Sequence, residues 1–279
     1  MKLFFPASVG AIEKAKDRVL TAILDLRQFA ICWPNETERK EIAARMYAKF
    51  EWPNCVFIVD RTLFLFATKP QLEDAADYKG RKLGYTLNAM ILCDDKRRIR
   101  SYLCGNPGTC HDERALKMMG IGKNPENFLS YMEYGIGDSA FDPRWWLVPA
   151  YKKPAHNNMP REHEVLNDKM KKPRVISEHV NGILKNRFKI LTSLPFVVKD
   201  KASMRVCIKY IDACVILHNL LVGTRHDVPD EFLEDVELLS DIDDCEPLEN
   251  NDELMQPILA HRRADTRRDQ LMHYFNELQ

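Results

Sequence analysis

The first hundred residues alternate between helical and extended hydrophobic patterns. Apolar residues recur at roughly helical spacing over residues 10–30, and the segment WPNETERKEIAARMYAKF predicts a turn, an Asn/Thr cap and a second helix. The apolar run CVFIVD predicts a buried strand that ends on Asp60, with LFLFA as its hairpin partner. GYTLNAMILCDD and IRSYLC are β-rich runs on either side of the charged turn DDKRR. We therefore expect a small antiparallel meander.

Helical patterns dominate the rest of the chain. GNPGTCHDERALKMMG predicts a loop followed by a helix, ENFLSYMEYG continues as a helix, and IGD is a short strand end. The Pro-, Asn-, His- and Lys-rich residues 142–168 predict a long loop. A helix is expected from about Lys169 to Leu191, with Pro173 near its start or kinking it. ASMRVCIKYIDACVILHNLLVG and RRADTRRDQLMHYFNEL predict two further helices.

This order of elements predicts a mixed α/β fold. Strands come first, a carboxylate follows at a strand end, and another carboxylate lies on a late helix, which is compatible with an RNase H-like sheet flanked by helices. We divide the chain into an N-terminal helical segment (1–50), an RNase H-like domain (51–225), an acidic mobile insert (226–257) and a C-terminal helix (258–279).

Composition is ordinary for a soluble globular protein, but charge is unevenly distributed. The 279 residues are 45% hydrophobic and 29% charged, and Lys plus Arg equals Asp plus Glu at 41. Residues 161–209 hold twelve Lys/Arg against five Asp/Glu, whereas residues 227–253 hold thirteen Asp/Glu and no Lys/Arg. A basic stretch followed by an acidic one indicates a polyanion-binding surface beside a solvated or regulatory segment.

The cysteines and the hydropathy pattern narrow the protein class. The eight cysteines form no CxxC pair and several lie in apolar runs, so we expect reduced, mostly buried thiols in an intracellular protein. The chain start makes a poor secretory signal. No run of about 18 apolar residues predicts a membrane span. Zinc-ligand spacing, GxGxxG and GxxxxGK[ST] are also absent from the sequence.

Two aspartates follow apolar strands and are candidate metal ligands. Asp60 ends FIVD and Asp138 lies in YGIGDSAF, so each would stand at a polar strand tip. Two-metal phosphoryl transfer needs several carboxylates converging on hard cations, and rigid strand ends and helices are suitable places for them. A turn or cap aspartate that closes a strand is the simpler interpretation of either residue alone.

Glu178 is the third candidate, on the predicted helix RVISEHVNGILKNRF. It lies on a polar face flanked by cations, and nearby Gly182 leaves room for close approach, which suits a metal ligand beside a phosphate backbone. A solvated charged helix face is the alternative. The apolar arc comprises Ile176, Val180, Ile183, Leu184, Phe188 and Leu191, and the polar arc comprises Glu178, Arg174, Lys185 and Lys189.

Five ordered blocks around these acids resemble the nuclease domain of Harbinger-type DDE transposases and their domesticated nuclease relatives. The blocks are PNCVFIVDRTLFLFATKP, YKGRKLGYTLNAMILCDDKRRIRSYLCGNPGTCHDERAL, GDSAFDPRWWLVPAYKKP, LNDKMKKPRVISEHVNGILKNRFKIL and IDACVILHNLL. The resemblance covers about residues 50–222. It implies an RNase H-like fold and a catalytic triad of Asp60, Asp138 and Glu178, which would bind Mg²⁺ or Mn²⁺ and cleave DNA phosphodiesters.

The resemblance also implies Asp112, in CHD, as a further metal ligand, although it could equally be a helix N-cap. His111 and His179 neighbour the acids, and either a phosphate contact or a packing role remains open for them. Arg174, Lys185 and Lys189 are candidates for nucleic-acid binding, because cations on that helix face would meet backbone phosphates.

Two departures from the family pattern leave the activity of this copy open. The family's first block usually reads Asp-Gly-Thr, and Arg61 replaces that glycine, bringing bulk and charge near the expected ions. Fifty-nine residues precede Asp60, whereas such transposases usually carry a helix-turn-helix region there. A separate DNA-binding partner protein, a homo-oligomer and a nuclear location would suit the resemblance. The alternative is a domesticated or decayed, catalytically inactive DNA-binding or interaction protein with the same fold.

Overall fold

The computed structural model describes residues 7–80, 84–154, 158–227 and 258–277, and in the last range the side chains from residue 267 onward. The expected acidic insert therefore lies outside the described residues, apart from its first two positions. The α-helices are α1 (Val9–Asp25), α2 (Arg27–Ala30), α3 (Glu36–Phe50), α4 (Asp112–Met118), α5 (Gly120–Lys123), α6 (Arg161–Arg187), α7 (Lys201–Leu221) and α9 (Ile258–Glu277). The strands are β1 (Cys55–Leu65), β2 (Lys79–Gly80), β3 (Gly84–Cys93), β4 (Ile99–Pro107), β5 (Tyr134–Gly137) and β6 (Leu147–Pro149), and 3₁₀ turns span Ala75–Tyr78, Pro125–Asn127 and Lys189–Leu191.

A mixed sheet carries the fold, with β1 near its centre. β1 pairs antiparallel with β3, which pairs antiparallel with β4 and β2, and on its other side β1 pairs parallel with β5, which pairs parallel with β6. β1 is apolar along most of its length because it is covered on both faces. This is the RNase H-like arrangement expected from the sequence, including the β1–β3–β4 meander.

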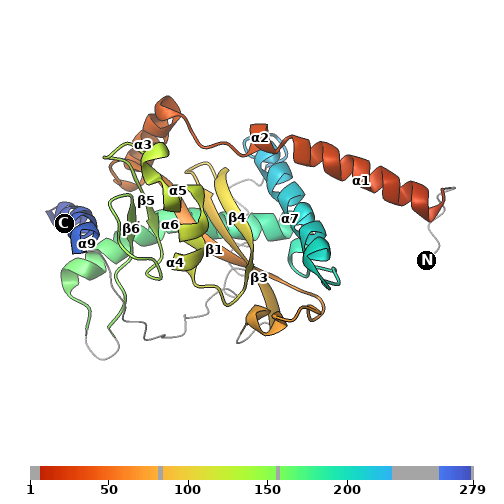
Figure 1. Cartoon of the computed structure of the whole chain (residues 1–279). Coiled ribbons are helices and arrows are strands. Elements are labelled where there is room, and N and C mark those ends of the chain that lie inside the picture. The colour runs from red at the N-terminus through yellow and green to blue at the C-terminus, as the bar shows by residue number, and fades with distance from the viewer. Residues whose placement is uncertain (1–6, 81–83, 155–157, 228–257, 278–279) are drawn as a thin grey trace.

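Helices cover both faces of this sheet. Figure 1 shows α6 running behind the strands, α4 in front of them, and α1 projecting away from the body beside α7. The last helix is anchored to the core, because Phe275 of α9 is fully buried and its ring centroid lies 4.8 Å from that of Trp52. No described helix is long and apolar enough to cross a membrane.

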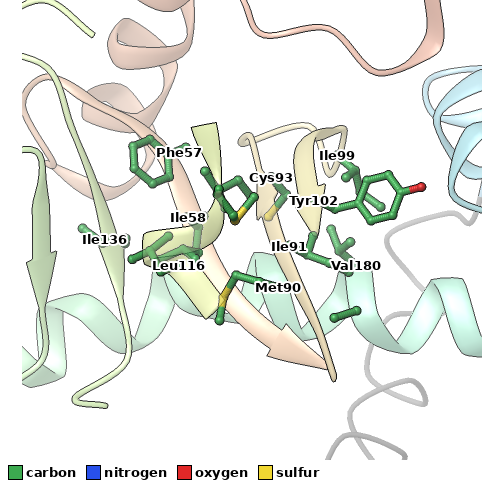
Figure 2. Close-up of a cluster of buried hydrophobic side chains, with 14 of the residues drawn as sticks. Phe57, Ile58, Met90, Ile91, Cys93, Ile99, Tyr102, Leu116, Ile136 and Val180 are labelled. Atoms are coloured by element: carbon green, nitrogen blue, oxygen red, sulfur yellow. The ribbon is translucent and has the colours of Figure 1, made fainter. Parts of the chain in front are cut away.

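The core forms where the strands meet α4 and α6. Figure 2 shows part of it, including Ile58 of β1, Ile136 of β5, Leu116 of α4 and Val180 of α6. These side chains are all completely buried. The helical wheel of the sequence is confirmed here, because Ile176, Val180, Ile183 and Leu184 are buried along one side of α6.

The expectation of buried cysteines is confirmed for much of the described chain. Cys55, Cys93, Cys207 and Cys214 are buried, and the described cysteines form no disulfide. Burial raises the pKa of the Cys207 and Cys214 thiols to about 12, so both stay protonated at neutral pH. These thiols therefore behave as packing groups.

One strand prediction was wrong. β1 does not end on Asp60 but continues to Leu65, and the first three residues of the expected hairpin partner LFLFA belong to the same strand. Asp60 and Arg61 interrupt the apolar run, and from the sequence alone that polar pair resembles a turn. The pairing with β3 continues through both residues without a break, because backbone hydrogen bonds do not depend on side-chain polarity.

Three helix and loop predictions were also wrong. ENFLSYMEYG is not a helix: it leaves a 3₁₀ turn, runs through irregular chain and ends in the first two residues of β5. The expected loop over 142–168 contains β6 and the first eight residues of α6. The helix expected from Lys169 to Leu191 begins earlier, at Arg161, and ends at Arg187, so Pro173 is not near its start and Lys189 lies on the following 3₁₀ turn. The remaining helix predictions, including the Asn35 cap on α3, are confirmed.

Gly135 keeps β1 and β5 close together, which leads to a stability prediction. A Cβ at this position would lie 2.2 Å from Cε2 of the buried Phe57 ring. Gly135→Ala is therefore expected to lower the unfolding free energy by about 1–3 kcal/mol, the usual cost of overpacking. Urea unfolding measures the change. Gly10→Ala is the control, because a Cβ there meets nothing within 4 Å; equal stabilities for both variants would contradict the prediction.

Candidate active site

The pairing register of β1 and β5 brings Asp60 and Asp138 side by side. The two strands are parallel, with Ile58 opposite Ile136, and each aspartate lies two residues further on. Side chains two residues apart in a strand point to the same face, and neighbouring strands are about 4.8 Å apart. β5 itself ends at Gly137, so Asp138 is the first residue beyond it. The two partly buried carboxylates thus occupy one edge of one sheet face.

Helix α6 crosses this face and contacts both aspartates. Asn181 Nδ2 donates to Asp60 Oδ2 at 3.1 Å, and Arg174 Nη1 lies 4.0 Å from Asp138 Oδ1. Glu178 is four residues after Arg174 and three before Asn181. Residues at these spacings form one stripe along a helix. Glu178 therefore lies between the two residues that contact the aspartates.

This stripe refines the helical wheel drawn from the sequence. Arg174 and Glu178 share a polar face, as expected, and both are partly buried rather than solvated. Asn181 was not among the residues predicted from the sequence. Its spacing of three from Glu178 on the same face is the signal that could have identified it. Lys185 continues along α6 and is partly buried, whereas Lys189 is exposed on the 3₁₀ turn and donates to Asn186 Oδ1 at 3.1 Å.

Arg61 points away from Asp60. Successive strand residues face opposite sides of a sheet, and Arg61 Nε forms an ion pair with Asp112 Oδ1 at 3.3 Å, at the first turn of α4. Only 16% of the Arg61 side chain and 9% of the Asp112 side chain are exposed, so the pair is shielded from water. The Arg61 side chain, which replaces the family's glycine, is thus directed toward α4 and away from the stripe of α6 residues that contact the aspartates.

The structure therefore distributes the predicted acids over two sheet faces. Asp60, Asp138 and Glu178 share the α6 side, and Asp112 is paired with Arg61 on the α4 side. Asp112 is not the cap of α4, because His111 holds that position, and the exposed His111 makes no side-chain cap hydrogen bond. Over the described residues, no three His, Cys, Asp or Glu side chains stand close enough together to hold a metal ion in the arrangement shown.

The α6-side residues nonetheless fit a divalent metal chemically. Each of the three acids supplies hard carboxylate oxygens, the ligands that Mg²⁺ and Mn²⁺ prefer. They come from a central strand, a strand end and a long packed helix, which are rigid elements. Arg174 offsets part of the negative charge of Asp138, and Asn181 holds the Asp60 carboxylate in one orientation.

A match to a family model places the chain in a known class. Residues 59–219 match the family described as DDE superfamily endonuclease, and because this is more than half of the chain, the protein belongs to that family. A curated relative, the mouse (Mus musculus) protein "Putative nuclease HARBI1", is 23% identical over 225 residues. That match covers 79% of this chain and 61% of the relative, so the chain spans under two thirds of the relative's length. No solved structure matches.

Proposed function

We propose that this chain is a divalent-metal-dependent DNA endonuclease or transposase catalytic domain, in which Asp60, Asp138 and Glu178 bind the metal. The observation that carries this is the α6 stripe, in which Arg174 and Asn181 contact the two aspartates and Glu178 lies between them. Membership in the DDE superfamily endonuclease family supports a nuclease-like function. The two-metal mechanism in this proposal rests on the chemistry of the three carboxylates.

Each residue of the site has a distinct role in this proposal. Asp60 and Asp138 would hold the ions, and Glu178 would complete the ligand set from the helix. When bound, a pair of such ions activates the attacking hydroxyl and stabilises the leaving oxygen. Asn181 fixes the rotamer of Asp60 through its amide hydrogen bond. Arg174 provides a guanidinium beside Asp138 that can hold a non-bridging phosphate oxygen.

Plasmid nicking with Mn²⁺ tests the proposal. Wild-type protein is expected to convert supercoiled plasmid to the open-circular form, and Glu178→Gln to lose most of this activity because a neutral amide is a poor ligand for a hard cation. Glu164→Gln is the matched control, because Glu164 is an exposed acid on the first turn of the same helix. Equal activity of the Glu178→Gln and Glu164→Gln proteins would refute the assignment of Glu178.

The competing function is a catalytically inactive DNA-binding or interaction protein with the same fold. Arg61 at the family's glycine position favours it. The Arg61–Asp112 pair argues against it, since it keeps Arg61 off the α6 stripe. Inert wild-type protein together with nicking by Arg61→Gly would establish the inactive alternative for the natural chain.

A nuclear location and a separate DNA-binding partner protein are further proposals. The location follows from a DNA substrate and the partner from the resemblance to Harbinger-type transposases. The location is tested by imaging a fluorescently tagged chain in cells. Exclusion of the tagged protein from nuclei would contradict it. Recovery of a DNA-binding protein with the tagged chain, from nuclease-treated extract, would support the partner.

A further inference from the structure

A pocket of about 770 Å³ lies on the other side of α6 from the three carboxylates. Its α6 wall includes Lys172, Ile176 and His179. Successive helix residues are about 100° apart, so this wall is nearly opposite the stripe of Arg174, Glu178 and Asn181. The pocket is thus separated from the candidate active site by the width of the helix.

Cations from three different elements surround the pocket. Lys49 comes from the end of α3, Lys96 and Arg98 from the β3–β4 turn, and Lys172 from α6. All four side chains are exposed, and none of them forms an ion pair within the part of the chain that the structure describes. They therefore leave a concentration of positive charge over one opening.

The two acids of the pocket are already matched by other cations. Asp95 accepts from Nε and Nη2 of Arg45 at 2.6 and 2.9 Å. Asp227 lies 3.1 Å from Arg187 Nη2 and 3.8 Å from Arg97 Nη2. Because these carboxylates are offset locally, they do not cancel the outer four cations.

The β3–β4 turn that carries Lys96 and Arg98 is held firmly in place. Buried Asp94 accepts from the backbone N–H groups of Lys96 and Arg98 at 2.9 and 3.0 Å and from Arg100 Nε at 2.7 Å. Between them, Arg97 has φ 65°, a left-handed conformation that non-glycine residues seldom adopt. The backbone positions of the two cations are therefore set before any ligand binds.

We propose that this pocket binds phosphates of the DNA backbone away from the position that is cleaved. The inference rests on the proposed nuclease function. Exposed lysines and arginines on separate rigid elements suit consecutive backbone phosphates, because such contacts need charge rather than base-specific geometry. His179, next to Glu178 in α6, lies on the pocket wall, so the same helix connects the two sites.

Fluorescence anisotropy with a labelled DNA duplex, without divalent metal, tests the pocket. The double variant Lys96→Ala/Arg98→Ala is expected to bind about tenfold more weakly or worse. The slope of log affinity against log salt is expected to fall by about 2, since each lost phosphate contact removes about 1. The matched control is Lys14→Ala/Arg18→Ala, which removes two exposed cations from α1 and is expected to bind like wild type. Melting temperatures verify that both variants fold.

Three outcomes would overturn the proposal that this pocket binds DNA phosphates. The first is a pocket variant that binds DNA with the wild-type affinity and salt slope. The second is an equal loss of binding in the α1 control. The third is unchanged DNA binding with lost binding of polyglutamate, which would assign the pocket to an acidic protein.

Plasmid nicking, run in parallel, separates this proposal from the nuclease function. If wild type nicks the plasmid and the pocket variant binds DNA like wild type, the nuclease proposal stands and the pocket proposal is refuted. If the pocket variant binds DNA more weakly and wild type does not nick the plasmid, the pocket proposal stands and the nuclease proposal is refuted.

Discussion

Asp60→Asn is expected to lower metal-dependent nicking by about three orders of magnitude. A metal ligand contributes several kcal/mol of transition-state stabilisation, and about 4 kcal/mol corresponds to a factor of roughly 10³ in rate. The fold should survive, because the asparagine carbonyl oxygen can still accept the hydrogen bond that Asn181 donates to Asp60. Single-turnover nicking with Mn²⁺ measures the effect. Asp168→Asn, which alters an exposed acid of α6, is the control.

Metal binding should also change the melting temperature of the protein. Neighbouring carboxylates repel each other when no cation lies between them, so Mg²⁺ or Mn²⁺ is expected to raise the melting temperature of the wild-type protein. This rise should be lost in Asp60→Asn and in Asp138→Asn and retained in Asp168→Asn. The same metal-induced rise in all four proteins would exclude Asp60 and Asp138 as ligands.

Acidification from pH 6.5 to about pH 4 is expected to destabilise the protein through His218 of α7. Burial lowers the pKa of this histidine from 6.5 to about 4, and the charge of neighbouring Arg187 adds to the effect. The main opposing influences are the hydrogen bond to the Arg97 carbonyl oxygen and the charge of Asp227, both of which favour the protonated ring. The ring is completely buried.

Acid destabilises the fold because the unfolded state binds the proton of His218 at a higher pH than the folded state does. The unfolded chain protonates His218 near pH 6.5, whereas the folded protein resists until about pH 4. Stability is therefore fully present above pH 6.5, declines as the pH falls, and stops changing through this group below about pH 4. The shift corresponds to about 3 kcal/mol.

The two ring nitrogens explain the preference for neutral histidine. Nε2 lies 3.0 Å from the Arg97 carbonyl oxygen and can donate to it, while Nδ1 lies 3.3 Å from Arg187 Nη1 and can accept from it. Protonation of Nδ1 would place two donors against each other. Urea unfolding across this pH range tests the prediction. His218→Gln offers one donor and one acceptor without titrating, so its stability should fall less steeply; equal slopes would contradict the assignment.

Local patterns predicted most of the elements but not their exact extents. The helices α3, α7 and α9 have clear apolar periodicity, and the DDKRR turn separates two β-rich runs, so each could be predicted from nearby residues. β1 could not be delimited, because Asp60 and Arg61 look like a turn until β3 is placed beside them. The start of α6 could not be predicted for a similar reason. Pro173 is a strong local signal against a helix interior, yet the packing of α6 against β1 and β5 keeps Pro173 inside the helix.

The sequence by itself determined the class of this protein and the identity of its candidate acids. Hydrophobic periodicity indicated a mixed sheet with helices, and the ordered blocks around Asp60, Asp138 and Glu178 indicated a DDE nuclease domain. These inferences need only residue types and their order along the chain.

Only the tertiary structure decided which side chains share a face. Arg61 follows Asp60 directly, yet strand alternation sends it to α4 and Asp112, whereas Asn181 reaches Asp60 from 121 positions away. The cation pocket likewise draws on α3, a hairpin turn and α6. The physical reason is that register and helix packing are set by the whole buried core, so contacts between distant residues cannot be read from the neighbours of either one.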